Sequence, residues 1–237
     1  MIEQHVVPGG RLLDAGCGRD LEFSREFASD VQVIGLDLEE KLDTRNQASP
    51  FALRGDLERL PFPENYFDLI ISRSVVEHLR NPLAVFREFE RVLRPGGRIV
   101  ISTPNKYDYV SIVAALTPYQ WHRSMVSKMT GVKEDDVFPT LYRANSLSSL
   151  GRQMREAGLT KRVLKAINHY PSYLMFSPVL FRIGMLYEKL TSFACFENLR
   201  GTILCVFEKE GRTAEAAVDR RAPARSGEEV GTAHSGA

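Results

Sequence analysis

The feature that most constrains this chain is the stretch from residue 11 to residue 18, which reads Arg-Leu-Leu-Asp-Ala-Gly-Cys-Gly. It ends an apolar run that predicts a short buried strand, comprising Val6, Val7, Leu12 and Leu13. Gly16 and Gly18 then let the backbone turn tightly, and residues 19–27 follow with apolar side chains at helical spacing. Strand, glycine turn and helix together open a nucleotide-binding βαβ unit.

The residues around the turn indicate which nucleotide fits there. A dinucleotide site favours a third glycine in the pattern G-x-G-x-x-G, but Leu21 stands at that position. Asp14 lies two residues before the first glycine, where its carboxylate would repel a pyrophosphate. The turn therefore favours a ligand with a cationic end and no phosphate, and S-adenosylmethionine has that character.

A second predicted strand, residues 31–37, ends in another acid. Asp37 lies 19 residues after Gly18, close to the distance at which an acid meets a ribose in such folds. A carboxylate can accept hydrogen bonds from both ribose hydroxyls, and Leu38 would then face the adenine. The alternative is an ordinary acid at the start of a loop.

Three strings occur along the chain in a fixed order: Leu-Leu-Asp-Ala-Gly-Cys-Gly at 12–18, Pro-Phe-Pro-Glu-Asn-Tyr-Phe-Asp at 61–68 and Leu-Arg-Pro-Gly-Gly at 93–97. Together they resemble the class I S-adenosylmethionine-dependent methyltransferases, in the small-molecule branch called methyltransferase domain 11. The resemblance spans about residues 11–104. It implies an α/β, Rossmann-like fold: a doubly wound, seven-stranded, mostly parallel sheet with an antiparallel last strand, plus helical insertions.

The same resemblance assigns cofactor contacts to positions of this chain. It places the amino-acid end of S-adenosylmethionine at the turn, formed by Asp14, Gly16, Cys17 and Gly18. It places the adenine at Asp56 and the amide of Leu57, although Asp56 also suits a plain turn residue. Ser72 and Ser74 end the fourth predicted strand, and strand carboxyl ends face the ligand in such sheets.

Methyl transfer from a sulfonium is an in-line displacement, so alignment supplies most of the catalysis, on the order of 7–11 kcal/mol. A general base matters when the acceptor is a hydroxyl. His78 and His122 are the candidate catalytic bases. His78 could instead pack under the cofactor, and His122 could be a surface residue. The spacing of the cysteines predicts no metal site.

Length and composition predict one methyltransferase domain, residues 1–210, with insertions at about 104–145 and 172–198 and a disordered tail at 211–237. The formal net charge of +1 and the lack of a basic patch argue against a nucleic-acid acceptor. Three cysteines suit a reducing compartment, and no secretory signal is apparent, so we expect a cytoplasmic protein.

The insertion at 172–198 is unusually rich in Leu, Met, Phe and Tyr, and three interpretations of it stand. It packs on the core or forms a dimer contact, it covers the active site, or it lies on the inner face of the membrane as a peripheral contact. The last interpretation would suit a lipid-linked acceptor. The oligomeric state is left open.

These observations predict a methyltransferase acting on a hydroxyl of a small-molecule, glycan or lipid-linked acceptor, because the aromatic insertions suit a ring, sugar or flat surface. Two alternatives come from other classes of protein. One is a nicotinamide-dependent oxidoreductase on a related fold, and the other is a non-catalytic cofactor-binding protein.

Overall fold

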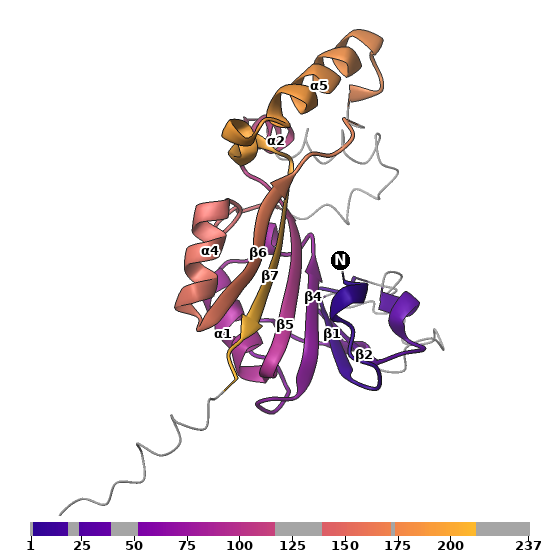
Figure 1. The fold of residues 1–237 in the computed structure, drawn as a ribbon, viewed down its shortest axis with the longest axis vertical. Helices are drawn as coiled ribbons and strands as arrows, with labels where there is room; N and C mark the ends of the chain where they lie inside the picture. The colour runs from indigo at the N-terminus through magenta and orange to yellow at the C-terminus, as the bar shows by residue number, and fades with distance from the viewer. Residues whose placement is uncertain (1, 19–23, 39–51, 117–138, 172–173, 212–237) are drawn as a thin grey trace, which may run out of the picture.

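The computed structural model describes residues 2–18, 24–38, 52–116, 139–171 and 174–211. Its centre is a seven-stranded sheet with the order β3-β2-β1-β4-β5-β7-β6 (Figure 1). The strands are β1 (Arg11–Ala15), β2 (Gln32–Asp37), β3 (Ala52–Arg54), β4 (Phe67–Arg73), β5 (Leu93–Pro104), β6 (Leu159–Ile167) and β7 (Thr202–Lys209). Strand β7 is antiparallel to both β5 and β6, whereas the other paired strands are parallel. The predicted Rossmann-like sheet is confirmed.

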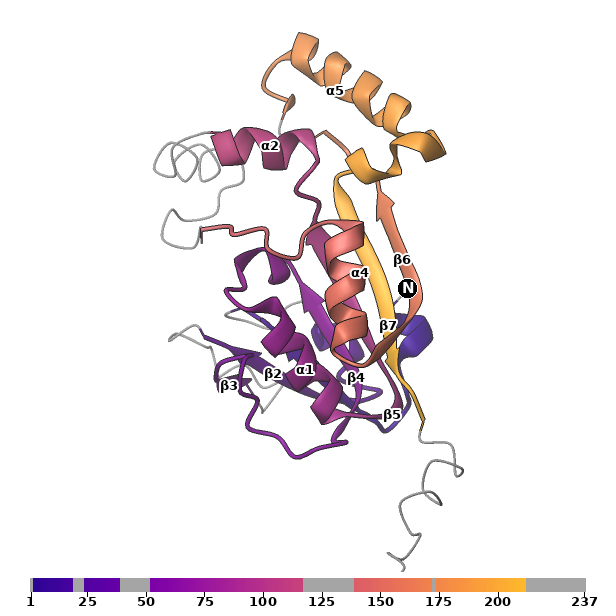
Figure 2. The ribbon, with the colours of Figure 1, turned by 90° about the vertical axis from the view of Figure 1, so that its left-hand side faces the viewer.

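Helices α1 (Pro82–Val92) and α4 (Leu147–Glu156) lie side by side on one face of the sheet (Figure 2). Asn81 caps α1, because its side chain accepts a hydrogen bond from the Ala84 amide at 3.4 Å. Ser146 caps α4 in the same way through the Ser149 amide. The apolar stripe of α1, with Phe86 and Phe89 fully buried, packs into the larger core cluster.

The other face of the sheet carries a smaller core. Leu12, Val33 and Ile71 are buried there, and Phe27 of η2 (Ser24–Phe27) covers them with the N-terminal segment that includes η1 (Glu3–His5). Both faces therefore contribute to the core, as a doubly wound sheet requires.

Some predicted boundaries were wrong. Val6 and Val7 lie outside β1, because a turn in which the Gly10 amide donates to the Val7 carbonyl at 2.8 Å separates them from it. Residues 50–57 predict a longer third strand, but β3 is confined to Ala52–Arg54. The sequence predicts the fifth strand only from Arg98, but β5 already begins at Leu93. The tail predicted from residue 211 onward is described only at its first residue, and the first predicted helix only from Ser24.

Three further elements lie beyond the end of the sheet at which β4 and β5 finish (Figures 1 and 2). They are α2 (Tyr109–Leu116), α5 (Pro178–Thr191) and η6 (Ala194–Leu199), here called the distal helices. They come from the two insertions that the sequence predicts at 104–145 and 172–198. Within the described ranges, no helix combines the length and apolar character needed to cross a bilayer.

Two buried carboxylates lie where the distal helices meet the sheet. Asp108 precedes α2 and is 1% exposed, and Glu188 of α5 is 9% exposed. Burial raises the pKa of both carboxyl groups, and the nearby His169 only partly opposes the rise. Burial and the charge of Asp108 also raise the pKa of Tyr187 to about 12. Among the described residues, neither carboxylate oxygen of Glu188 has a hydrogen-bond partner.

These raised pKa values predict how stability depends on pH. The folded protein holds protons on Asp108 and Glu188 at pH values where the unfolded chain has released them, so lowering the pH from neutrality toward the ordinary carboxyl range should increase the free energy of unfolding. Each fully linked proton contributes up to about 1.4 kcal/mol per pH unit. Denaturant titrations across this range measure the slope, which D108N and E188Q should flatten.

Glu208 supplies the matched control. Hydrogen bonds from Arg162 and Arg98 lower its pKa, so its contribution is present above the ordinary carboxyl range and is lost only as the pH falls through that range. E208Q should therefore keep the wild-type slope between about pH 5 and pH 8. Unchanged slopes in D108N and E188Q would show that the two acids ionise normally.

Candidate active site

The glycine turn after β1 packs directly against the segment that follows β4. Gly16 has φ +79° and its amide donates to the Leu36 carbonyl at 2.8 Å, so the turn is also tied to β2. A Cβ on Gly16 would lie only 2.2 Å from Cγ2 of Val75. The turn thus sits where the strand order reverses between β1 and β4, which is the place where open α/β sheets bind ligands.

Asp37 joins this turn to the end of β2. Its Oδ2 accepts a hydrogen bond from the Gly18 amide at 2.9 Å, and its carbonyl accepts one from the Gly55 amide at 2.9 Å. The turn, Asp37 and the segment after β3 therefore meet at one edge of the sheet, as the sequence predicts. Leu38 follows Asp37 and leaves 65% of its surface exposed at this edge.

The remaining predicted residues of the turn lie mostly inside the protein. Asp14 is 5% exposed within β1, beside Gly35 and Ile71 in the register of the sheet. Cys17 is half-buried and packs against the smaller core, while a Cβ added to Gly18 would meet no other described residue within 4 Å. Among the described residues, the turn therefore leaves open space at Gly18, next to Asp37.

Asp56 and Leu57 follow β3 with contrasting environments. Asp56 is exposed and its Oδ1 accepts a hydrogen bond from the Glu58 amide at 2.9 Å, so it does act as a turn residue. Leu57 is buried in the larger core, which fixes its backbone at the edge of the site. A carboxylate can accept several hydrogen bonds, so the predicted adenine contact is compatible with this turn.

The end of β4 carries two unusual serines. Ser72 is 1% exposed, and its hydroxyl has no hydrogen-bond partner among the described residues. Ser74 has φ +54°, a left-handed conformation that is uncommon outside glycine, and its amide donates to the Ser102 carbonyl at 2.9 Å. An orphaned buried hydroxyl beside a strained strand end is typical of a ligand site.

His78 ends η3 (Val76–His78), directly after this strand end. Its Nδ1 lies 3.0 Å from the Pro139 carbonyl, which can only accept a hydrogen bond, so Nδ1 carries a proton. Its Nε2 lies 4.0 Å from Oε1 of Glu77. With the proton on Nδ1, Nε2 is the ring nitrogen that carries the lone pair of the neutral imidazole.

A buried polar chain that the sequence did not predict lies behind His78. The Thr103 hydroxyl donates to Oε2 of Glu77 at 2.8 Å and accepts from the side-chain amide of Asn145 at 2.6 Å. Burial raises the pKa of the Glu77 carboxyl, although the hydrogen bonds and the nearby His78 oppose the rise. The chain fixes η3 against β5 and so sets the position of His78.

The pair Asn145-Ser146 in the sequence predicts a helix cap, but only Ser146 caps α4. The Asn145 side chain points into the core, where it also donates to the Pro104 carbonyl at 3.0 Å. The only sequence signal for the chain was the Glu-His pair at 77–78. His122 lies at 117–138, outside the described residues, so its predicted role stays a prediction. Among the described residues, no three His, Cys, Asp or Glu side chains gather in a metal-binding arrangement.

Comparison with known proteins bears on the part of the chain that builds this site. Residues 13–101 match the model of a family described as a methyltransferase domain. The chain is 37% identical over 117 residues to the malonyl-[acyl-carrier protein] O-methyltransferase of Erwinia pyrifoliae, covering 47% of this chain and 45% of that protein. It is 32% identical over 107 residues to phosphoethanolamine N-methyltransferase 3 of Arabidopsis thaliana, covering 41% and 21%.

The fold as a whole resembles solved structures. Phosphoethanolamine N-methyltransferase 2 of Haemonchus contortus, in complex with S-adenosyl-L-methionine, matches with a TM-score of 0.54 at 17% identity. The match covers 88% of this chain and 51% of that one. The chain spans less than half the length of the curated relatives it matches. The family model covers β1 to β5, and the fold likeness extends further.

The two glycines of the turn form a matched pair for mutation. G18A should lower the free energy of unfolding by about 1–2 kcal/mol, because only its positive φ is strained. G16A should cost about 1–3 kcal/mol more, because its Cβ also collides with Val75. Denaturant unfolding measures both, and G16A/V75A should recover part of the difference. Equal losses for G16A and G18A would contradict the close contact.

Proposed function

We propose that this chain, whose residues 13–101 belong to the methyltransferase domain family, is an S-adenosylmethionine-dependent methyltransferase. Its acceptor is a hydroxyl on a small-molecule, glycan or lipid-linked compound. The observation that carries the proposal is the glycine turn held between Val75 and Asp37, with open space at Gly18.

The residues at the carboxyl edge of the sheet fit this cofactor. The turn and Asp14 would hold its cationic amino-acid end, Asp37 its ribose, and Asp56 with the Leu57 amide its adenine. Ser72, with its orphaned hydroxyl, and Ser74 would line the methionine end. When bound, S-adenosylmethionine supplies a methyl group already activated by the positive charge on its sulfur. The chain has to align the acceptor and exclude water.

The same features oppose a nicotinamide cofactor. Its pyrophosphate would meet the Asp14 carboxylate, and Leu21 replaces the third glycine that lets a helix approach it closely. The match to the methyltransferase family supports the same choice. A non-catalytic role would not require the oriented imidazole ring of His78.

A hydroxyl acceptor is supported by His78. Pro139 accepts a hydrogen bond from its Nδ1–H, so Nε2, the nitrogen 4.0 Å from Oε1 of Glu77, is the one that would take the acceptor proton. General-base catalysis of this kind is worth roughly 10²- to 10⁴-fold. The relatives named above include an O-methyltransferase and an N-methyltransferase, so the choice of acceptor rests on the residues of this chain.

Cofactor binding is tested by calorimetric titration with S-adenosylmethionine and S-adenosylhomocysteine, alongside thermal-shift measurements with NAD and NADP. We expect heat with the first two ligands and no stabilisation by the nucleotides. Transfer of a labelled methyl group into an extract, separated into lipid, polar small-molecule and protein fractions, identifies the acceptor class. Binding without any transfer would favour the non-catalytic alternative.

Replacing the ribose acid should weaken cofactor binding while the fold remains. D37N keeps an oxygen that can accept the Gly18 amide but turns the second oxygen into a donor, so the dissociation constant of S-adenosylhomocysteine should rise at least tenfold. D30N, an exposed acid before β2, is the matched control and should bind as the wild type does. Equal affinities for D37N and D30N would remove Asp37 from the site.

The candidate bases are tested with the labelled acceptor fraction. H78A should lower the transfer rate by roughly 10²-fold or more at saturating cofactor, because the acceptor hydroxyl loses its proton acceptor. Its affinity for S-adenosylhomocysteine should stay close to that of the wild type. H122A is assayed in parallel, and losses below tenfold in both variants would remove histidine from the mechanism.

A further inference from the structure

Helix α5 turns an apolar stripe to the outside of the molecule. Val179, Ile183, Leu186 and Leu190 follow one another at helical spacing and are each half-exposed or more, from 50% to 66%. Such a stripe normally faces a protein core. Here it faces away from the sheet.

The opposite side of α5 is fixed to the body of the protein. A Cβ added to Gly184 would lie 2.8 Å from both Pro171 and Leu174, so this side is already in close contact. The Asn168 side chain donates to the Glu188 carbonyl and accepts from the Thr191 hydroxyl. These contacts set the rotation of α5, and the stripe cannot turn inward without breaking them.

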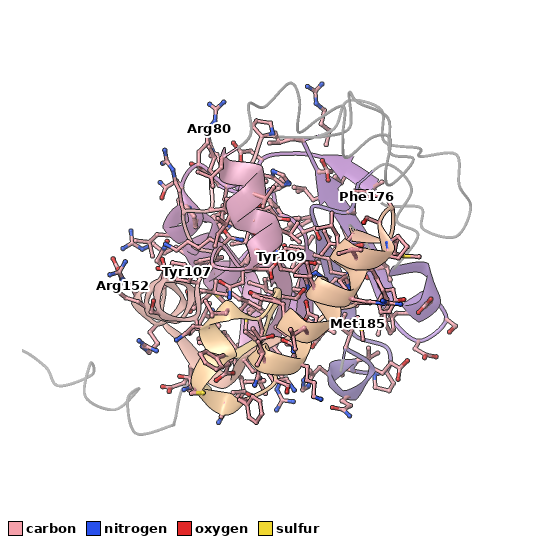
Figure 3. All side chains as sticks on the ribbon, turned by 90° about the horizontal axis from the view of Figure 1, so that it is seen from above. Arg80, Tyr107, Tyr109, Arg152, Phe176 and Met185 are labelled. Atoms are coloured by element: carbon pink, nitrogen blue, oxygen red, sulfur yellow. The ribbon has the colours of Figure 1, made fainter. Side chains whose placement is uncertain are left out.

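The apolar surface continues beyond α5. Figure 3 shows α5 crossing this end of the molecule, with Phe176 at one end of it and Met185 along it. Most of the exposed large apolar side chains of the described residues belong to the distal helices or adjoin them, among them Leu116, Phe176, Met185, Phe193 and Phe196.

The exposed charges of α5 have one sign. Arg182 and Lys189 are exposed and lie on the same flank of α5. Glu188 is the only acid between residues 174 and 196, and it is buried on the inner side. An apolar strip with a cationic flank complements a membrane surface that carries anionic headgroups.

We propose that the exposed stripe of α5 docks on an anionic lipid surface, with the helix lying in the interface. The helix has 14 residues, too few to span a bilayer and enough to lie along its surface. A lipid interface accepts a convex helix without a complementary groove. A second copy packed antiparallel through the stripe would instead bring the Arg182 and Lys189 flanks of both copies together.

Docking in this way would bring the carboxyl edge of β4 and β5 close to the lipid, since the distal helices lie beyond that edge (Figure 1). An acceptor with a lipid portion could then reach the cofactor without leaving the interface. This consequence rests on the proposed function, whereas the docking itself does not.

The test is flotation of the full chain with vesicles of phosphatidylcholine alone and with about a third phosphatidylglycerol. We expect the wild type to float with the anionic vesicles and largely to remain behind with the neutral ones. I183S/L186S should reduce the bound fraction at least tenfold. R182Q/K189Q should reduce both binding and its sensitivity to salt. V7S, which changes an exposed valine of the N-terminal segment, is the matched control and should bind normally.

Folding of each variant is checked by circular dichroism and its mass by sedimentation. Absence of wild-type binding to anionic vesicles, or equal binding by I183S/L186S, would overturn the proposal. A wild-type dimer that I183S/L186S converts to a monomer, without vesicle binding, would overturn it in favour of a self-association surface. Flotation without any heat from S-adenosylhomocysteine would leave docking standing and refute only the proposed function.

Discussion

The contact between the Gly16 backbone and Val75 is the constraint on which the rest of the site depends. It brings the turn after β1 so close to the segment after β4 that no Cβ fits between them, at the point where the strand order reverses between β1 and β4. Because Gly16 also donates to the Leu36 carbonyl, the same turn positions the end of β2 and with it Asp37. The cofactor contacts proposed at the ends of β1, β2 and β4 therefore all depend on the position of this turn. A side chain at Gly16 would disturb all of them together.

Much of the fold could be predicted because its signals are local. The glycine turn, the Asn81 cap and the apolar stripe of α1 each depend on residues within a few positions of one another. The order of the strands could not be obtained in this way, because pairing β1 with β4 joins residues more than fifty positions apart. That prediction came from the order of three motifs that resemble a known family. Val6 shows the limit of a local pattern, since a turn at Gly10 removed it from its expected strand.

The parts of the site that could not be predicted are long-range polar contacts. Glu77, Thr103 and Asn145 meet only after β4, β5 and the start of α4 have assembled, and a lone Asn before a serine predicts a helix cap better than a buried donor. Asp108 and Glu188 are 80 positions apart and likewise have no local signature. Such groups are costly to bury, and burial raises the pKa of the Asp108 and Glu188 carboxyls.

Helix α5 reverses the usual arrangement of a surface helix. It buries Glu188 and Thr191 against the protein and exposes Ile183 and Leu186 to the outside. A buried carboxyl is tolerated here because its raised pKa keeps it neutral over a wider pH range. No other described residue covers the exposed stripe, and its contact with water is unfavourable. A helix with a polar inner side and an apolar outer side suits a position between the protein and an apolar medium beyond it. The buried Glu188 and the exposed stripe thus both follow from the orientation of α5, which is fixed by the contacts of Gly184 and Asn168.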